Sequence, residues 1–404
     1  MSRIVMKFGG TSVGSVDRIN HVSSIVKSEF DLGNQVVVVL SAMAGETDKL
    51  INLTKDLSDN FLASEYDVVI SSGEQVSAGA LSGLLNSQGV KAQSRLGWQI
   101  PIVTSGDHKS SRIEVIHSKE LINLLESNVV VIIPGFQGIN SEGRITTLGR
   151  GGSDTSAVAI AAAIDADFCD IYTDVDGVYT SDPNKVPTAK RLDKISYEEM
   201  LEMSSLGAKV MQPSAVQAAM ANNIAVHVRS TFSEKSGTII SSEDEMDTKK
   251  VVTGVTYSKN DAKVTLLNVE DKPGVAAEIF EPLGKSNINV DMVVQNISSD
   301  KKETDITFTI KREDLEKTIN IIKKNTATIK YKKLMHDDKV SKVSIIGAGM
   351  IVHPGVTHKM FRALANEKIN IMVISTSEIK ISVLIDEKMT QKAVKILHKT
   401  FKLD

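Results

Sequence analysis

The chain has 404 residues, a net charge of −3, 41% hydrophobic and 24% charged residues. This composition is ordinary for a folded protein of two or three domains, and neither half is basic enough to indicate nucleic-acid binding. A single cysteine, Cys169, excludes a disulfide framework within one chain and suits a reducing compartment. Because we find no signal peptide and no apolar stretch of transmembrane length, we expect a cytoplasmic protein without membrane contact.

Residues 1–240 alternate between buried strands and helices. The patterns predict strands at 4–8, 35–40, 67–71, 129–134, 168–173 and 225–229. They predict helices at about 16–30, 73–88, 117–126, 154–165, 196–204 and 212–221. Continuous apolar runs are typical of parallel strands that helices cover on both faces. The sequence therefore predicts a three-layer α/β/α sandwich with a mainly parallel sheet.

The first predicted strand runs into Lys7, and Gly9, Gly10, Thr11 and Ser12 follow it. Glycines let backbone N–H groups approach an anion, and hydroxyl side chains can cap the next helix, whose N-terminus favours negative charge. The pattern favours a phosphate-binding loop. It is not a Walker A motif, and a joint between strand and helix needed only for packing would have the same local sequence.

Further polar motifs are predicted at strand ends, where ligand sites of such sheets lie. They are Ser41–Gly45, Ser72–Glu74, Gly149–Asp154 and Thr173–Gly177. Three of them have a structural alternative: residues 71–74 read as a helix capping box, Asp154 as a helix cap and 173–177 as a turn. The eight histidines show no metal-ligand spacing.

A polar stretch at 233–250 reads as a linker, and residues 262–404 contain an internal repeat. Each copy has a strand, a Pro-Gly turn that leads a helix, and a second strand. In the first copy these are predicted at 263–269, 271–285 and 288–292. In the second copy they are predicted at 342–347, 353–366 and 369–372. A further strand and helix follow at 304–310 and 312–324, then at 379–385 and 389–400. The first copy has a fourth strand at 327–332, and we expect 251–257 to supply the one that the second copy lacks.

These motifs together resemble the aspartokinase group of the amino acid kinase family, whose members carry tandem ACT domains. The resemblance rests on Lys7–Gly14, Ser72–Glu74, Gly149–Asp154, Tyr172–Pro183 and Gly207–Met211, and on the two Pro-Gly turns. It implies a catalytic domain at 1–240, with an aspartate-binding lobe to about 165 and a nucleotide lobe at 166–240. A linker at 241–261 and two βαββαβ ACT domains at 262–337 and 338–404 would follow.

The resemblance implies transfer of the γ-phosphoryl group of ATP, with Mg²⁺, to the β-carboxylate of L-aspartate, the first step toward lysine, threonine and methionine. The implied catalytic residues are Lys7, Asp154 and Lys209. The implied aspartate-binding residues are Ser41, Glu74, Arg150 and Ser153. Besides Lys7 and Lys209, the implied ATP-binding residues are Gly9, Gly10, Ser12, Thr173, Asp174, Tyr179, Asp182 and Lys185, the last in place of the family's usual arginine. No protein ligand of the metal is assigned.

The ACT repeat implies feedback inhibition by lysine, threonine or both. The implied contacts are Asp271, Gly274, Ala276, Ala277, Gln295, Asn296, His353, Val356, Thr357, Asn370 and Ile371. It also implies a homo-oligomer, or assembly with a shorter regulatory chain begun near Met246. The alternatives are a kinase acting on glutamate or acetylglutamate, a non-catalytic amino-acid sensor, and a C-terminal half that serves only for dimerisation.

Overall fold

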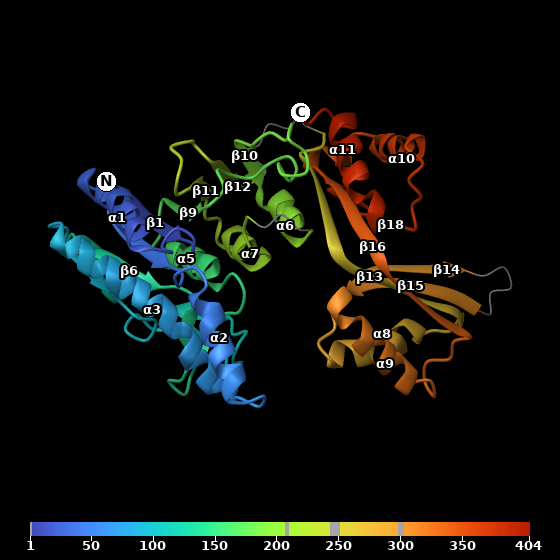
Figure 1. The fold of residues 1–404 in the computed structure, drawn as a ribbon, viewed down its shortest axis with the longest axis horizontal. Helices are drawn as coiled ribbons and strands as arrows, with labels where there is room; N and C mark the ends of the chain where they lie inside the picture. Colours follow the sequence, from blue (N-terminus) through green and yellow to red (C-terminus); the bar gives the residue numbers. More distant parts are fainter. Residues whose placement is uncertain (1, 207–209, 243–250, 298–302) are drawn as a thin grey trace. The chain divides into compact units, whose positions relative to one another are not determined.

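The computed structural model describes residues 2–206, 210–242, 251–297 and 303–404. The chain forms two compact units (Figure 1). The N-terminal unit comprises Met1–Tyr179 and Arg191–Asp247, and the C-terminal unit comprises Thr180–Lys190 and Thr248–Asp404. The segment Thr180–Lys190, which we expected in the nucleotide lobe, therefore belongs to the other unit.

The N-terminal unit is built on an eight-stranded sheet of order β10-β12-β11-β9-β1-β2-β6-β3. All neighbours are parallel except β11 and β12, which confirms the mainly parallel sheet. The strands are β1 (Arg3–Phe8), β2 (Gln35–Leu40), β3 (Ala92–Ser94), β6 (Val130–Pro134), β9 (Phe168–Thr173), β10 (Lys194–Ser196), β11 (Val226–Ser230) and β12 (Thr238–Ser241). Since β12 lies within the stretch predicted as a linker, that prediction began too early.

A second sheet, of order β5-β4-β7-β8, was not predicted. Its strands are β4 (Ile102–Thr104), β5 (Ile113–Ile116), β7 (Gln137–Ile139) and β8 (Ile145–Thr147). Strands of three or four residues are too short to show a hydrophobic period.

Seven helices are described in this unit: α1 (Val16–Asp31), α2 (Glu46–Leu57), α3 (Ala63–Ser87), α4 (Lys119–Glu126), α5 (Gly152–Ala163), α6 (Tyr197–Ser205) and α7 (Pro213–Asn222). The strand predicted at 67–71 is wrong, because these residues lie inside α3. A short apolar run does not distinguish a strand from a buried helical segment.

The helix cap predicted at Thr11 or Ser12 is also wrong, since Ser15 caps α1 by accepting a hydrogen bond from the backbone N–H of Arg18 (3.3 Å).

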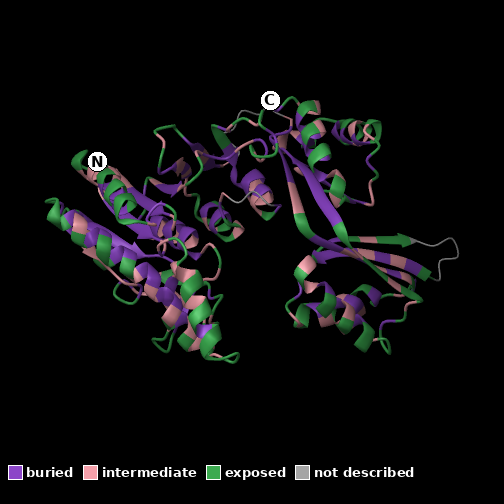
Figure 2. Ribbon diagram, viewed as in Figure 1, coloured by how far each residue is buried: buried purple, intermediate pink, exposed green. Residues whose placement is uncertain are grey.

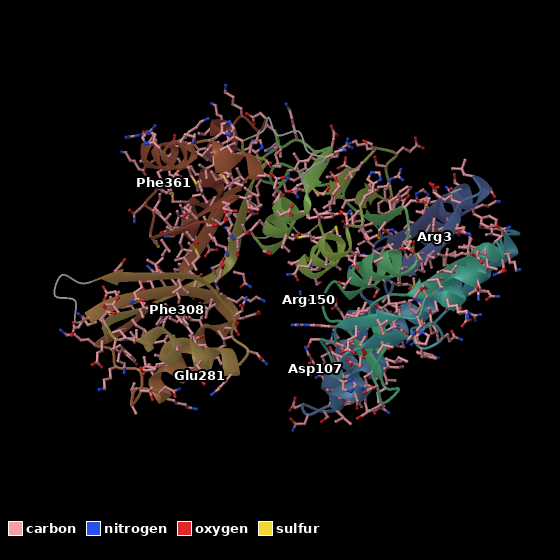
Figure 3. The ribbon with its side chains drawn as sticks, turned by 180° about the vertical axis from the view of Figure 1, so that it is seen from behind. Arg3, Asp107, Arg150, Glu281, Phe308 and Phe361 are labelled. Carbon is pink, nitrogen blue, oxygen red and sulfur yellow. The ribbon has the colours of Figure 1, made fainter. Side chains whose placement is uncertain are left out.

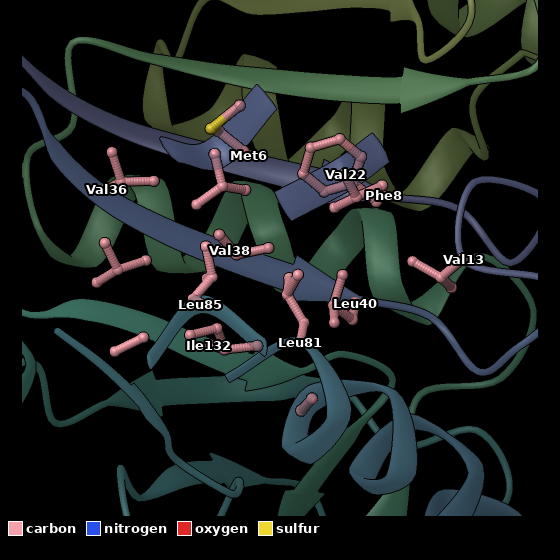
Figure 4. Close-up of a cluster of buried hydrophobic side chains, with 14 of the residues drawn as sticks. Met6, Phe8, Val13, Val22, Val36, Val38, Leu40, Leu81, Leu85 and Ile132 are labelled. Atoms are coloured by element: carbon pink, nitrogen blue, oxygen red, sulfur yellow. The ribbon is translucent and has the colours of Figure 1, made fainter. Parts of the chain in front are cut away.

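The core of the N-terminal unit explains which way each β1 side chain points. Met6 and Phe8 are fully buried against α1 and α3, together with alternate residues of β2 (Figure 4). Successive strand residues face opposite sides, so Lys7 points to the other face of the sheet, where α5 packs. Strands β1 and β2 are buried almost throughout. Figure 2 shows that the helices at the surface of this unit, by contrast, alternate between buried and exposed residues.

The C-terminal unit has one six-stranded sheet of order β14-β15-β13-β16-β18-β17. The strands are β13 (Gly254–Glu270), β14 (Val290–Ile297), β15 (Glu303–Lys311), β16 (Lys333–Ile346), β17 (Val373–Thr376) and β18 (Lys380–Asp386). Helices α8 (Val275–Lys285) and α9 (Leu315–Lys324) pack over one hydrophobic cluster, and α10 (Val356–Asn366) and α11 (Thr390–Thr400) pack over another. This is the pair of βαββαβ modules that the repeat predicts.

The two modules share their longest strands. Residues 254–258 of β13 pair with 342–346 of β16, so part of the segment 251–257 does complete the second module. Residues 261–267 of β13 pair with 333–340 of β16 in the first module. The fourth strand predicted at 327–332 is therefore wrong, since β16 takes that place. The second strand of the second module was predicted at 369–372 but begins at Val373.

A polar cluster joins the segment Thr180–Lys190 to the end of the chain. The side chain of His398 is fully buried, and its Nε2 lies 2.9 Å from the hydroxyl of Thr180. Its Nδ1 lies 3.0 Å from Asp404, whose carboxylate also accepts a hydrogen bond from Thr188 (2.5 Å). Since Val186 lies in the adjacent hydrophobic cluster, the segment is held by apolar and polar contacts.

The buried histidine predicts a pH dependence of stability. Burial lowers the pKa of His398 below 6.5, although Asp404 opposes the shift. The fold therefore favours the neutral ring, and stability is lost as the pH falls below 6.5, by less than about 1.4 kcal/mol per pH unit. We expect His398→Gln to weaken this loss between pH 6.5 and 5, measured by denaturant unfolding of the full chain. The exposed His358→Gln is the control, and equal profiles for the two variants would contradict the prediction.

Candidate active site

Loops from four strands meet at the carboxyl edge of the main sheet. The backbone N–H of Gly9, after β1, donates to the carbonyl of Tyr172 in β9 (3.2 Å). The N–H of Ser41, after β2, donates to Phe8 (3.1 Å), and the N–H of Gly135, after β6, donates to Leu40 (2.9 Å). The predicted motifs at 7–12 and 41–45 therefore lie side by side, and the N–H of Ala44 donates to the carbonyl of Gly10 (3.1 Å).

A buried ion pair lies at the centre of this edge. Lys7 Nζ pairs with Asp154 Oδ1, and each residue is only 8% exposed. Asp154 lies in the first turn of α5, whose backbone N–H groups and dipole favour an anion. A lysine and a helix N-terminus that converge in this way form a site suited to a phosphoryl group.

The glycines after β1 allow the neighbouring loops to approach closely. A Cβ on Gly10 would lie 2.7 Å from the carbonyl oxygen of Ala42, so a larger residue would push the two loops apart. The hydroxyl of Ser12 is fully buried and lies 2.6 Å from that of Thr231. Ser12 thus joins the loop after β1 to the end of β11. Thr231 is the second residue after the strand predicted at 225–229, and its hydroxyl at that position was a signal that sequence analysis missed.

Glu74 reaches the site from α3, a helix and not the strand end that we predicted. Its Oε1 accepts a hydrogen bond from the N–H of Ala42 (3.2 Å), next to Ser41. Its Oε2 is buried and has no hydrogen-bond partner among the described residues. Burial raises the pKa of Glu74 to about 7. A buried carboxyl group with an unused oxygen is suited to a cationic ligand group.

The turn before α5 carries Arg150 and depends on glycine. Gly151 has a φ of +72°, and a Cβ there would overlap the side chain of Gln212. Ser153 is buried against Gly135, where a Cβ would lie 2.8 Å from the serine Cβ. Arg150 itself is exposed and lies at the surface of the unit (Figure 3).

The predicted nucleotide residues are divided between the units. Thr173 is the last residue of β9 and Asp174 follows it, and the carbonyl of Thr173 accepts a hydrogen bond from Thr231 N–H (2.9 Å). The hydroxyl of Tyr179 donates to Asp176 (2.6 Å). Although burial acts to raise the pKa of Asp176, hydrogen bonds from Lys235 and from Tyr179 lower it.

Asp182 and Lys185 belong to the C-terminal unit. Asp182 accepts hydrogen bonds from the hydroxyl of Tyr257 (3.2 Å) and the N–H of Asn184 (2.9 Å), and Lys185 is exposed. Lys209 and Met246 lie outside the described residues.

The two Pro-Gly turns of the C-terminal unit have the same geometry. Gly274 and Gly355 precede α8 and α10 with φ values of +93° and +96°, a conformation that L side chains rarely adopt. Among the predicted contacts, Val356 is buried and Ile371 half-buried. The other predicted contacts are exposed, namely Asp271, Ala276, Ala277, Gln295, Asn296, His353, Thr357 and Asn370.

Neither a metal cage nor a membrane helix is present in the described part of the chain. No three His, Cys, Asp or Glu side chains gather there as for a metal ion. None of its helices has the length and apolar character needed to span a bilayer.

Comparison with known proteins identifies both halves of the chain. Residues 2–230 match the amino acid kinase family, and residues 267–325 and 343–401 match an ACT domain. The aspartate kinase of Pseudomonas putida is 48% identical over 405 residues, with 100% of this chain and 98% of that protein covered. The aspartokinase of Helicobacter pylori is 46% identical, with 99% of each covered.

Solved structures of aspartokinases have the same fold as this chain. E. coli aspartokinase III in complex with aspartate and ADP superposes with a TM-score of 0.84 at 26% identity, covering 98% of this chain and 99% of that one. The same enzyme in complex with lysine and aspartate gives a TM-score of 0.78 at 26% identity over 98% and 99% of the two chains. This chain therefore belongs to the aspartate kinases, ATP-dependent phosphotransferases of the amino acid kinase family that carry ACT domains.

Proposed function

We propose that the N-terminal unit transfers the γ-phosphoryl group of ATP to the β-carboxylate of L-aspartate through the site around Lys7. The observation that carries this proposal is the buried Lys7–Asp154 ion pair at the N-terminus of α5, beside the loop of Gly9 and Gly10. Phosphoryl transfer needs alignment and neutralisation of charge on the phosphoryl oxygens. Lys7 supplies a cation, and the loop and helix supply N–H groups. The acceptor is already a carboxylate at neutral pH, so no general base is needed.

Aspartate carries one ammonium and two carboxylate groups, and the site offers a partner for each. Glu74 binds the ammonium with its unused oxygen. Arg150 binds the α-carboxylate, for which a guanidinium is suited by bidentate pairing. Ser41 and Ser153, at the ends of the loops around Lys7, hold the carboxylate that is phosphorylated.

ATP binds with its ribose and base at Thr173, Asp174 and Tyr179, and Lys209 serves as a second cation. Mg²⁺ would supply further neutralisation of phosphate charge when bound. We assign no protein ligand to the metal and propose that phosphates and water hold it chiefly.

The test is release of ADP from MgATP with L-aspartate, glutamate or acetylglutamate as acceptor. We expect ADP release that depends on aspartate, and little ADP release with glutamate or acetylglutamate as the acceptor. Preference for glutamate or acetylglutamate would refute the assigned acceptor, and no turnover with any of them would favour a non-catalytic sensor.

We further propose that lysine, threonine or both inhibit the kinase through the C-terminal unit. The turns at Gly274 and Gly355 have a backbone geometry suited to presenting N–H groups to a carboxylate, and Asp271, Gln295 and Asn370 are the polar contacts that we propose for the amino acid. The related E. coli enzyme has been solved with lysine bound. Binding that favours a less active arrangement of the chain would lower turnover.

We expect turnover to fall when lysine, threonine or both are added, measured by the same ADP assay at a fixed aspartate concentration. Alanine, added at equal concentration, is the control. Turnover that ignores both amino acids, together with no uptake in equilibrium dialysis, would refute the regulatory role and leave the kinase intact.

The ACT pair also leads us to propose assembly between chains, as a homo-oligomer or with a shorter chain begun near Met246. Light scattering of native material gives the mass of the assembly, and a denaturing gel shows whether a second chain is present. A monomer at micromolar concentration would refute this proposal.

A further inference from the structure

Asp67 is a fully buried carboxylate that no part of the proposed chemistry uses. It lies on α3, and both of its oxygens accept hydrogen bonds from two segments far along the chain. From one segment come His108 Nδ1 (2.8 Å) and the N–H of Lys109 (3.1 Å). From the other come the hydroxyl (2.7 Å) and the N–H (3.2 Å) of Thr147, the last residue of β8. A buried charge is tolerated when it is satisfied in this way.

These hydrogen bonds determine the shape of the 107–111 loop. Lys109 has a φ of +68°, which non-glycine residues adopt only at a cost, and Asp67 accepts the N–H of this residue. The loop is joined to β8 a second time, since the N–H of Ser111 donates to the carbonyl of Thr147 (2.9 Å). The loop and the end of β8 are therefore held together at two points, one of which is the Asp67 carboxylate.

The loop in turn contacts the turn that carries Arg150. A Cβ on Gly149, the residue before Arg150, would lie 3.3 Å from the carbonyl oxygen of Lys109. Thr147 is only three residues before Arg150. Asp67 therefore holds the turn in two ways, through Thr147 in the strand that leads into it and through the loop packed against it. Figure 3 shows Arg150 and Asp107, which opens the loop, on the same unit.

We infer that Asp67 is a positioning residue for aspartate binding, which acts by holding the Arg150 turn in place. The inference rests on the proposed role of Arg150 in binding the α-carboxylate. Glu74 lies seven residues after Asp67 on the same helix, about 10 Å along its axis. Helix α3 therefore contributes to binding two groups of the substrate aspartate. Glu74 binds the ammonium directly, and Asp67 acts on the α-carboxylate indirectly, through the Arg150 turn.

The experiment compares Asp67→Asn with Thr147→Val and with Glu65→Gln as a control. Asparagine keeps the size but loses the charge and places an NH₂ group among donors. Glu65 lies on the same helix, is exposed and pairs with Arg144, outside the proposed site. We expect Asp67→Asn to raise the KM for aspartate about tenfold or more, because hydrogen bonds to a charged group are lost. Thr147→Val should give a smaller rise, and the KM for ATP should change less than about twofold in both.

A role confined to stability would give a different result. It would lower the melting temperature and the active fraction but leave the KM for aspartate unchanged, and that outcome would overturn the inference. If Asp67→Asn does not fold, Thr147→Val, which removes one hydroxyl donor, decides the question by the same KM comparison.

Arg150→Gln separates this inference from the function on which it rests. An unchanged KM for aspartate in Arg150→Gln would refute the proposed role of Arg150 and with it the inference. A raised KM in Arg150→Gln with an unchanged one in Asp67→Asn would overturn the inference alone. If Asp67 acts through Arg150, the double variant should have no higher KM than Arg150→Gln, whereas additive effects would contradict that route.

Discussion

Lys7→Met is expected to lower kcat with aspartate about 10²–10³-fold, because it removes a fixed cation from the phosphoryl group in the transition state. Methionine keeps most of the length of the side chain without its charge. The measurement is steady-state ADP release at saturating aspartate and MgATP. Lys27→Met is the matched control, since Lys27 is half-buried at the surface and pairs with Asp31 one turn along α1, away from the proposed site. A kcat within about threefold of the parent would contradict the catalytic role of Lys7.

The same substitution has a second effect that must be kept apart from catalysis. Without Lys7, Asp154 is left buried and unpaired, which is expected to cost about 3–5 kcal/mol of stability. The double variant Lys7→Met with Asp154→Asn removes both charges and should recover much of that stability. It should not recover activity. Recovered turnover in the double variant would mean that Lys7 acts only by neutralising Asp154.

The elements predicted correctly are those with a long hydrophobic signal. The run Val36–Leu40 predicts β2 because five apolar residues in sequence are typical of a strand covered on both faces. The shorter apolar run Val68–Ile70 gave a similar local signal but lies in α3, where the helix buries one face and exposes the other. Only the tertiary environment separates the two cases. The strands of the small sheet are stabilised by pairing with one another, which local sequence does not report.

The sequence predicted the parts of the site whose geometry requires glycine. It did not predict the residues whose role depends on a partner far along the chain. Gly10 and Gly151 mark close approaches that no other residue allows, so their motifs stand out in the sequence. Asp67 and Thr231 gain their roles only from partners 41 to 219 residues away. The segment Thr180–Lys190 was misplaced for the same reason, since its partners lie at the far end of the chain.

Glu74→Gln is expected to raise the KM for aspartate about a hundredfold or more and to leave the KM for ATP nearly unchanged. The amide cannot supply the negative charge that the ammonium needs in a buried site. Gln75→Glu, which keeps a carboxylate one residue away, should not rescue activity when combined with it. Steady-state kinetics with each substrate varied in turn checks the result. An unchanged KM for aspartate would show that Glu74 does not contact the amino acid.

The raised pKa of Glu74 predicts a pH dependence with a definite sign. Its pKa rises from 4.5 to about 7 on folding, so ionisation opposes folding as the pH rises through this range. The cost is absent below pH 4.5 and reaches roughly 3 kcal/mol above pH 7. Glu74→Gln should therefore be more stable than the parent above pH 7 and equal to it near pH 4.5, measured by denaturant unfolding without ligand.

Bound aspartate should reverse the difference in stability between Glu74→Gln and the parent. Its ammonium favours the ionised carboxylate, so binding should lower the pKa of Glu74, release a proton between about pH 5 and 7, and remove the cost of ionisation. Calorimetry of aspartate binding in buffers of different ionisation enthalpy measures that proton, and Glu74→Gln should release none. The destabilised carboxylate is then a source of specificity, because only a ligand with a cation at this position stabilises it. Equal proton release by the parent and the variant would place the titrating group elsewhere.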